Sequence, residues 1–300
     1  MLPGRMKALR SLAGLFLAAS SCFGQTFVWQ SPSPAPAEAA ALLRAVCPGA
    51  VQTGGSATVS LPGCKPCPQF TMNSSSPRMA MRESFDLHTV IYGSFTFPGV
   101  HEAVAGFEGC EPHAREFGGS VLLSKLHGSW AMVDYTPALI TSACQTYHLK
   151  TGRDLLLCEE DDHHMAGVSQ WISVCDFSKE GASRCQSVFD VLDTRVACGH
   201  SAVWGSIDKV LLRDLNGDGM PDLTLWFSVG QATFPNAGGS CNSGTVHAPV
   251  QKHQLDFLFQ QNTDSFRPAP WSKALADSYR AFFSAAQQTA FEAITPKPSH

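Results

Sequence analysis

The chain has 300 residues, of which 15% are charged, and its formal net charge is −4 at pH 7. Because it carries no basic patch, nucleic acid is disfavoured as a partner. Low charge together with 25 glycines, 19 prolines and 11 cysteines favours a disulfide-bonded, mainly β protein over a helical one.

Residues 1–24 have the pattern of a secretory signal peptide. Basic residues between Arg5 and Arg10 precede an apolar stretch from Leu12 to Ala19, and small residues follow. This pattern predicts cleavage near Gly24 and a secreted or periplasmic protein. The apolar stretch is too short to span a bilayer, and no transmembrane segment is expected later in the chain. The alternative is a lipid anchor on Cys22, although the residues before it lack the leucine of the usual lipidation motif.

The cysteine content also favours export. One of the 11 cysteines lies in the predicted signal, and the even number that remains predicts up to five disulfides. Spacing does not determine the connectivity, but Cys185 with Cys198 and Cys158 with Cys175 are reasonable pairs because each flanks a single turn or hairpin. The segment Cys64-Lys65-Pro66-Cys67 lies in a proline-rich loop, which favours a structural disulfide over a redox or zinc site.

Residues 25–84 precede the main body of the chain. A proline-rich linker runs up to Pro36, and residues 37–46 are expected to form a short helix that ends before Pro48. We expect residues 48–84 to be irregular and to be held in place by their cysteines.

Residues 85–268 contain a repeat with a period near 60 residues. Each unit begins with a strand, a glycine turn, an acidic residue and an apolar strand, and Glu102, Asp154 and Asp222 take equivalent places. A second hairpin-like stretch follows in every unit, so each is expected to hold about four strands, as in radial β architectures. The first hairpins are residues 89–105, 147–158 and 207–227, and the second stretches are residues 120–135, 171–192 and 254–267.

The third unit carries the pattern of a calcium loop. Oxygen-bearing side chains fall at loop positions 1, 3, 5 and 9, with glycine at position 6, as a calcium loop requires. Position 12 is Leu225 where an EF-hand has glutamate, and both flanks have strand character, so we expect Ca²⁺ at a β-hairpin tip. The alternative is a turn that binds no ion, although repulsion among three carboxylates disfavours it. The predicted ligands are Asp214, Asn216, Asp218, the Met220 carbonyl and Asp222.

The pattern Asp214-x-Asn216-x-Asp218-Gly219-x-x-Asp222-Leu223 between two strands resembles the calcium hairpin of FG-GAP/VCBS-type repeats. Such repeats form β-propeller blades in integrin heads and in many secreted bacterial proteins. The resemblance covers roughly residues 85–268 and is specific in one unit. It implies a mainly β fold of three four-stranded, propeller-blade-like units and a chiefly structural calcium ion. Because three units cannot close a ring, a partial or open propeller, a capped stack or an oligomer is expected.

The densest run of ionisable residues is Glu159 to His164. We expect it on a loop just after a strand at 155–158, where the histidines could bind a transition metal. The alternative is a solvated acidic loop with two titrating histidines. The candidate ligands of this second metal site are Asp161, Asp162, His163 and His164.

Residues 269–300 are predicted to form a C-terminal amphipathic helix and a tail. Ser272 can begin the helix, Pro296 ends it, and the apolar side is expected to pack on the β domain. That side carries Leu275, Tyr279, Phe282, Phe283, Ala286 and Ala290.

The motifs define no complete catalytic constellation. The predicted function is therefore a secreted, calcium-stabilised binding or interaction module for a protein or carbohydrate ligand. The alternative is a secreted hydrolase that acts on a saccharide or phosphoester, centred on residues 159–164 or on another carboxylate pair. A deep cleft lined by acids would favour the enzyme, and a flat face with an aromatic patch would favour binding. Four tryptophans on or beside predicted strands could stack on sugars, although burial in the core is commoner: Trp130, Trp171, Trp204 and Trp226.

Overall fold

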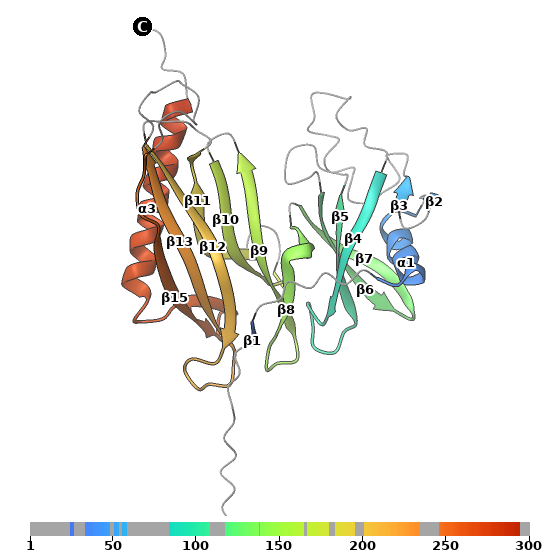
Figure 1. Cartoon of the computed structure of the whole chain (residues 1–300). Coiled ribbons are helices and arrows are strands. Elements are labelled where there is room, and N and C mark those ends of the chain that lie inside the picture. The colour runs from blue at the N-terminus through green and yellow to red at the C-terminus, as the bar shows by residue number, and fades with distance from the viewer. Residues whose placement is uncertain are drawn as a thin grey trace, which may run out of the picture.

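The computed structural model describes residues 25–26, 34–48, 51–53, 56–58, 84–108, 118–137, 139–164, 167–179, 184–195, 201–233 and 246–294. Within these residues the chain forms three antiparallel sheets and two α-helices (Figure 1). The predicted signal, Cys22, the Cys64–Cys67 segment and Cys198 lie outside the described residues. No helix of the described residues is long and apolar enough to cross a membrane.

Each sheet is built on four antiparallel strands, and short strands extend sheets 1 and 3. Sheet 1 holds β4 (Ser84–Gly93), β5 (Glu102–Glu108), β6 (Gly118–Leu126) and β7 (Ser129–Pro137). Sheet 2 holds β8 (Cys144–His148), β9 (Asp154–His164), β10 (Gly167–Cys175) and β11 (Cys185–Asp193). Sheet 3 holds β12 (Ser201–Arg213), β13 (Asp222–Thr233), β15 (Gln251–Gln260) and β16 (Ser265–Pro268). The short strands are β1 (Gln25–Thr26) and β14 (Val246–His247) in sheet 3, and β2 (Val51–Thr53) and β3 (Ser56–Thr58) in sheet 1.

The repeat predicted from the sequence is confirmed at the level of the sheets. Glu102, Asp154 and Asp222 each begin the second strand of a sheet's first hairpin, and each pairs with the last residue of the preceding strand. The three turns lie at the same end of the molecule, at the bottom of Figure 1. We call this end, formed by residues 94–101, 149–153 and 214–221, the turn end.

Two segments expected to be irregular or looped contain strands among their described residues. Residues 48–84 contain β2 and β3, which extend sheet 1 through antiparallel pairing with β4. The run from Glu159 to His164 is not a loop but the second half of β9, paired in register with β10 down to His164 and Gly167. A run of charged residues has low strand propensity, so the sequence did not predict a strand here. Pairing with β10 holds these residues in a strand nevertheless.

Two disulfides link neighbouring strands of sheet 2. Cys144 of β8 bonds Cys158 of β9, and Cys175 of β10 bonds Cys185 of β11; both pairs have Cα atoms 4.0 Å apart. The pairings suggested from spacing, Cys158 with Cys175 and Cys185 with Cys198, are therefore wrong. Each bonded pair is a directly opposed cross-strand pair, and register rather than sequence distance selects it. Cys47, after the first helix, is also disulfide-bonded.

Sheet 2 is the middle layer and has both faces covered. One face packs Leu156, Cys158 and Cys175 against Ile91 and Val104 of sheet 1. The opposite face packs Leu155, Leu157 and Ile172 against Leu223, Leu225 and Phe227 of sheet 3. Burial on both faces accounts for the unbroken apolar run in β9, because a strand covered on both sides needs no polar alternation.

Both predicted helices form, and the C-terminal helix packs on the β domain as expected. Helix α1 (Pro36–Val46) packs Leu42, Leu43 and Val46 on the outer face of sheet 1. Helix α3 (Lys273–Ile294) buries Ala276 and Phe283 in the cluster shared by sheets 2 and 3. It runs along one side of the molecule, at the left of Figure 1, and Leu275 of its predicted apolar side is 36% exposed.

Sheets 2 and 3 also join directly. The Thr194 amide, just after β11, donates to the Val203 carbonyl of β12 at 2.8 Å. The described chain is thus a stack of three four-stranded sheets flanked by helices, with two of the sheets hydrogen-bonded at one corner.

Candidate calcium loop and acidic cavity

The candidate calcium loop, residues 214–221, joins β12 to β13 at the turn end. Arg213 and Asp222 pair across its base, which closes the loop. Gly217 and Gly219 have φ values of 77° and 79°, a left-handed conformation that glycine adopts without steric cost. The two glycines therefore permit the tight coil that the pattern predicts.

Hydrogen bonds within the loop organise its side-chain oxygens. Asp214 accepts from the amides of Gly217 at 2.7 Å and Gly219 at 2.8 Å. Asn216 Oδ1 accepts from the Asp218 amide at 2.9 Å, and Asp218 Oδ1 accepts from the Met220 amide at 2.8 Å. The amides, first that of Gly219, hold the pKa of Asp214 below its usual value.

Asp222 anchors the loop to the core. Its side chain is fully buried, and its two oxygens accept from the amides of Leu215 and Phe259, both at 2.8 Å. Burial raises the pKa of Asp222, and these two hydrogen bonds oppose the rise. Phe259 belongs to β15, so this single carboxylate ties the loop to a neighbouring strand.

Sheet 2 also contacts the loop. The Tyr147 hydroxyl, at the end of β8, donates to the Pro221 carbonyl at 2.6 Å. Burial raises the pKa of this phenol, and the carboxylates of Asp222 and Asp218 raise it further. Lys150, in the β8–β9 turn, donates from its ammonium group to the Asp218 main-chain carbonyl. These contacts join residues about 70 positions apart, and no local sequence signal could have revealed them.

The chemical type of the loop's donor atoms suits calcium. All five predicted ligands supply oxygen, which is what calcium prefers, and Leu225 is fully buried in the core and takes no part. Within the described residues, however, no group of three or more His, Cys, Asp or Glu side chains is placed to hold an ion. Calcium binding therefore stays a prediction.

The equivalent acids of the other two units, like Asp222, accept hydrogen bonds from main-chain amides. Glu102 accepts from the amides of Phe95 at 2.6 Å and Thr96 at 2.8 Å, within its own turn. Asp154 accepts from the Ser94 amide of the neighbouring turn at 2.7 Å. Both carboxylates are buried, so they act as structural acceptors at the turn end.

Strand β9 divides the acidic run between its two faces. Residues Glu159, Asp161 and His163 alternate with Glu160 and Asp162, because successive strand residues point to opposite sides. Asp161 Oδ2 lies 3.2 Å from His163 Nε2 on an exposed surface. The four residues proposed as a second metal site, including His164, thus share one strand rather than one loop, and the metal-binding prediction stays untested.

Part of this run lines a cavity of about 690 Å³ bounded by β9, β10, the end of β11 and the start of β12. Glu159 accepts from Gln170 Nε2 at 2.5 Å, and Gln170 Oε1 accepts from the Ile207 amide at 2.8 Å. Gln170 thereby fixes Glu159 relative to sheet 3. The lining residues are Ala143, Glu159, Glu160, Asp161, Val168, Gln170, Asp193, Arg195, Trp204, Gly205 and Ser206.

Among the described lining residues, the only cationic side chain is already paired. Arg195 contacts Asp193 through Nη2 at 2.5 Å and Nε at 3.0 Å, and its guanidinium lies 5.1 Å from the Trp204 ring centre. Trp130, Trp171 and Trp226 are likewise only partly buried. None of the four tryptophans, Trp204 included, is fully buried in the core.

Comparison with protein-family models, with curated proteins and with solved structures finds no match.

Proposed function

We propose that this protein is a secreted, calcium-stabilised, disulfide-bonded β-repeat protein that acts as a binding module. The observation that carries the calcium part is the loop 214–221, where Asp214, Asn216 and Asp218 supply side-chain oxygens around a coil organised by their own hydrogen bonds. The two disulfides are compatible with an oxidising compartment outside the cytoplasm.

The propeller-blade resemblance belongs to this proposal. Three consecutive four-stranded sheets, each with its first turn at the same end, support a partial propeller in which one blade holds an ion. The role of calcium would be structural: an ion at the turn end would neutralise the carboxylates of the β12–β13 loop.

The test is thermal unfolding with calcium and with chelator. An ion at a hundred times its Kd adds roughly 2.7 kcal/mol, or about 5–10 °C in Tm for a chain of this size. Asp218→Ala should remove most of this shift, whereas Asp277→Asn, on the surface of α3, should keep it. Equal Tm values with calcium and chelator would reject the calcium site.

A second candidate function is hydrolysis of a saccharide or phosphoester, and the acidic cavity favours it. Glu159 and Asp161 lie on the same face of β9 beside this cavity, and paired carboxylates perform acid–base chemistry on glycosidic bonds. Turnover of p-nitrophenyl glycosides or p-nitrophenyl phosphate, abolished in Glu159→Gln and Asp161→Asn, would support the enzyme. The control is Asp162→Asn, on the opposite face of the strand. Absence of turnover on both substrate classes would leave the binding module as the better account.

A further inference from the structure

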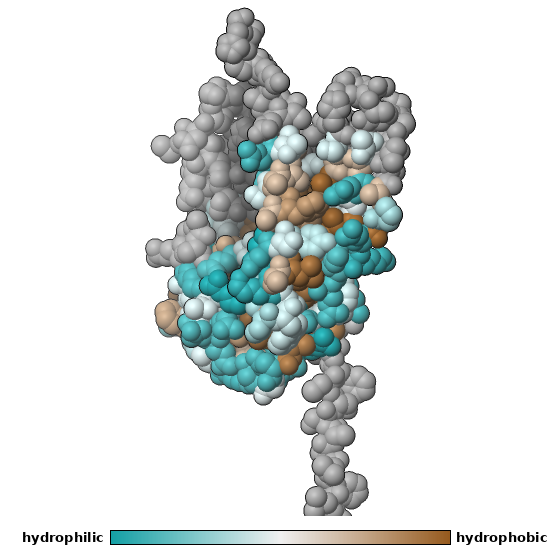
Figure 2. Space-filling view, turned by 90° about the vertical axis from the view of Figure 1, so that its left-hand side faces the viewer, coloured by the Kyte–Doolittle hydropathy of each residue, from teal (hydrophilic) through white to brown (hydrophobic). Residues whose placement is uncertain are grey.

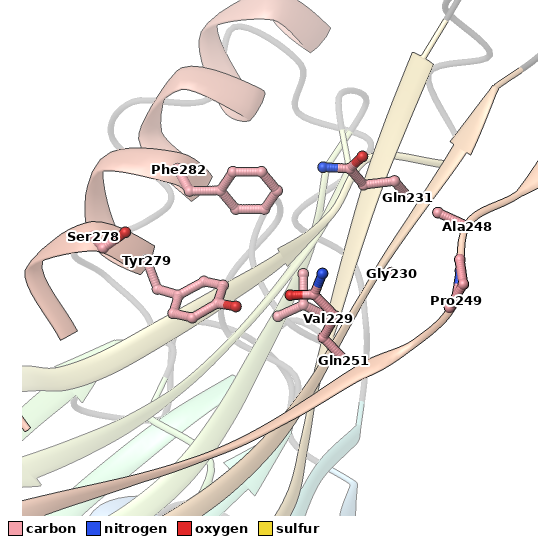
Figure 3. A pocket seen from close by; sticks show the side chains of 9 residues that line it. All are labelled: Val229, Gly230, Gln231, Ala248, Pro249, Gln251, Ser278, Tyr279 and Phe282. Carbon is pink, nitrogen blue, oxygen red and sulfur yellow. The ribbon is translucent and has the colours of Figure 1, made fainter. Parts of the chain in front are cut away.

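A second cavity, of about 360 Å³, lies between helix α3 and sheet 3. Its size falls within the range of small-molecule sites, roughly 300–1,000 Å³. Figure 3 shows Tyr279 and Phe282 projecting from the helix across the cavity from Val229, Gln231 and Gln251 of strands β13 and β15. Apolar residues also gather on the upper part of this side of the molecule (Figure 2).

The aromatic wall of the cavity is held rigidly. The Tyr279 hydroxyl and His253 Nε2 are hydrogen-bonded, and the two ring centres lie 4.7 Å apart. Tyr279 also meets Phe227 edge-on at 5.0 Å and Phe282 at 6.0 Å. Two aromatic rings are therefore fixed at the cavity before any ligand arrives, which lowers the entropy cost of binding.

The polar groups of the cavity are neutral. Gln231 and Gln251 each offer an amide that both donates and accepts, and Ser278 offers a hydroxyl. None of the nine described residues that line the cavity is Asp, Glu, Lys or Arg. A charged ligand would thus lose hydration without gaining a counter-charge. A fully apolar ligand would make no use of the two glutamine amides, which are exposed at the cavity.

We propose that this cavity binds a neutral saccharide unit. A sugar ring combines an apolar C–H face, which can lie on Phe282, with a rim of hydroxyls that donate to and accept from Gln231 and Gln251. The assignment extends the proposed binding function by naming its ligand class and its place. It is independent of the calcium loop, which lies at the turn end.

The experiment measures binding of a panel of uncharged sugars by titration calorimetry and saturation-transfer NMR. The panel contains glucose, galactose, N-acetylglucosamine, maltose and cellobiose, and galacturonate is titrated beside it as the charged counterpart of galactose. At least one should bind, and Phe282→Ala and Gln251→Leu should each weaken its binding about tenfold or more, which corresponds to about 1.4 kcal/mol. Matched controls are Phe291→Ala on the same helix and Gln261→Leu in the β15–β16 turn, neither of which lines the cavity.

Three results would overturn the saccharide site. They are no binding across the panel, binding that Phe282→Ala and Gln251→Leu leave unchanged, and tighter binding of galacturonate than of galactose. The calcium-dependent Tm is measured on the same samples. If calcium raises the Tm but no sugar binds, only the saccharide site is rejected. If a sugar binds but calcium does not change the Tm, only the calcium site is rejected.

Discussion

The ammonium group of Lys150 donates a hydrogen bond to the main-chain carbonyl of Asp218. Lys150 belongs to the β8–β9 turn of sheet 2, and Asp218 lies in the middle of the candidate calcium loop of sheet 3. The second unit, which lacks carboxylates in its own turn, thus supplies a cation to the turn of the third. Because calcium would bind beside this ammonium, the two positive charges would repel each other.

The first prediction is that Lys150→Met tightens calcium binding. Removing an exposed charge near the site is worth roughly 0.2–1 kcal/mol, so we expect a Kd roughly 1.5- to 5-fold lower, with a larger effect at low salt. Calcium titration at two ionic strengths measures this change. Lys273→Met, on α3, is the control and should leave the Kd unchanged. A weaker affinity in Lys150→Met would mean that the lysine organises the loop instead of opposing the ion.

The second prediction concerns the buried acid of the first hairpin. Glu102→Ala leaves the amides of Phe95 and Thr96 without their acceptor, so we expect a loss of about 2–4 kcal/mol in the free energy of unfolding. Chemical denaturation measures the loss, and Glu102→Gln, which keeps one acceptor oxygen, should lie between it and the wild type. Asp277→Ala, an acid on the exposed surface of α3, should have little effect. Wild-type stability in Glu102→Ala would show that the turn does not depend on this carboxylate.

The third prediction is that peptide mapping of the unreduced protein finds Cys144 linked to Cys158 and Cys175 linked to Cys185. Replacing both members of either pair by serine should lower the free energy of unfolding by about 2–4 kcal/mol, because each bond restricts the unfolded chain. Thiol titration under denaturing conditions should find few or no free cysteines in the mature protein. A Cys158–Cys175 peptide would contradict the register of sheet 2.

The fourth prediction is a pH dependence that involves His253. Burial lowers the folded-state pKa of His253 below 6.5, so the unfolded chain binds the proton more readily. The contribution of neutral His253 to the free energy of unfolding is therefore complete above pH 6.5. It is lost as the pH falls towards the folded-state pKa of this residue. Stability measured from pH 7.5 to 5 should fall more steeply in the wild type than in His253→Gln. Parallel curves would show that this imidazole does not titrate differently in the two states.

The sequence alone determined the local elements of the fold. Glycine turns followed by an acid and an apolar strand marked all three first hairpins, because turn conformation and strand propensity depend on neighbouring residues. The amphipathic period of residues 275–290 marked helix α3 for the same reason. The calcium pattern at Asp214 to Asp222 also lies within one loop and is readable without a fold.

Only the tertiary structure decided what lies between the sheets. The stacking of sheets 2 and 3 placed Lys150 against Asp218, and helix α3 against sheet 3 created the cavity of Tyr279 and Phe282. Strand register chose Cys158 and Cys144 as partners, and pairing with β10 carried β9 through its acidic end. Such contacts join residues far apart in the chain, and their free energy depends on packing and register that no local pattern encodes.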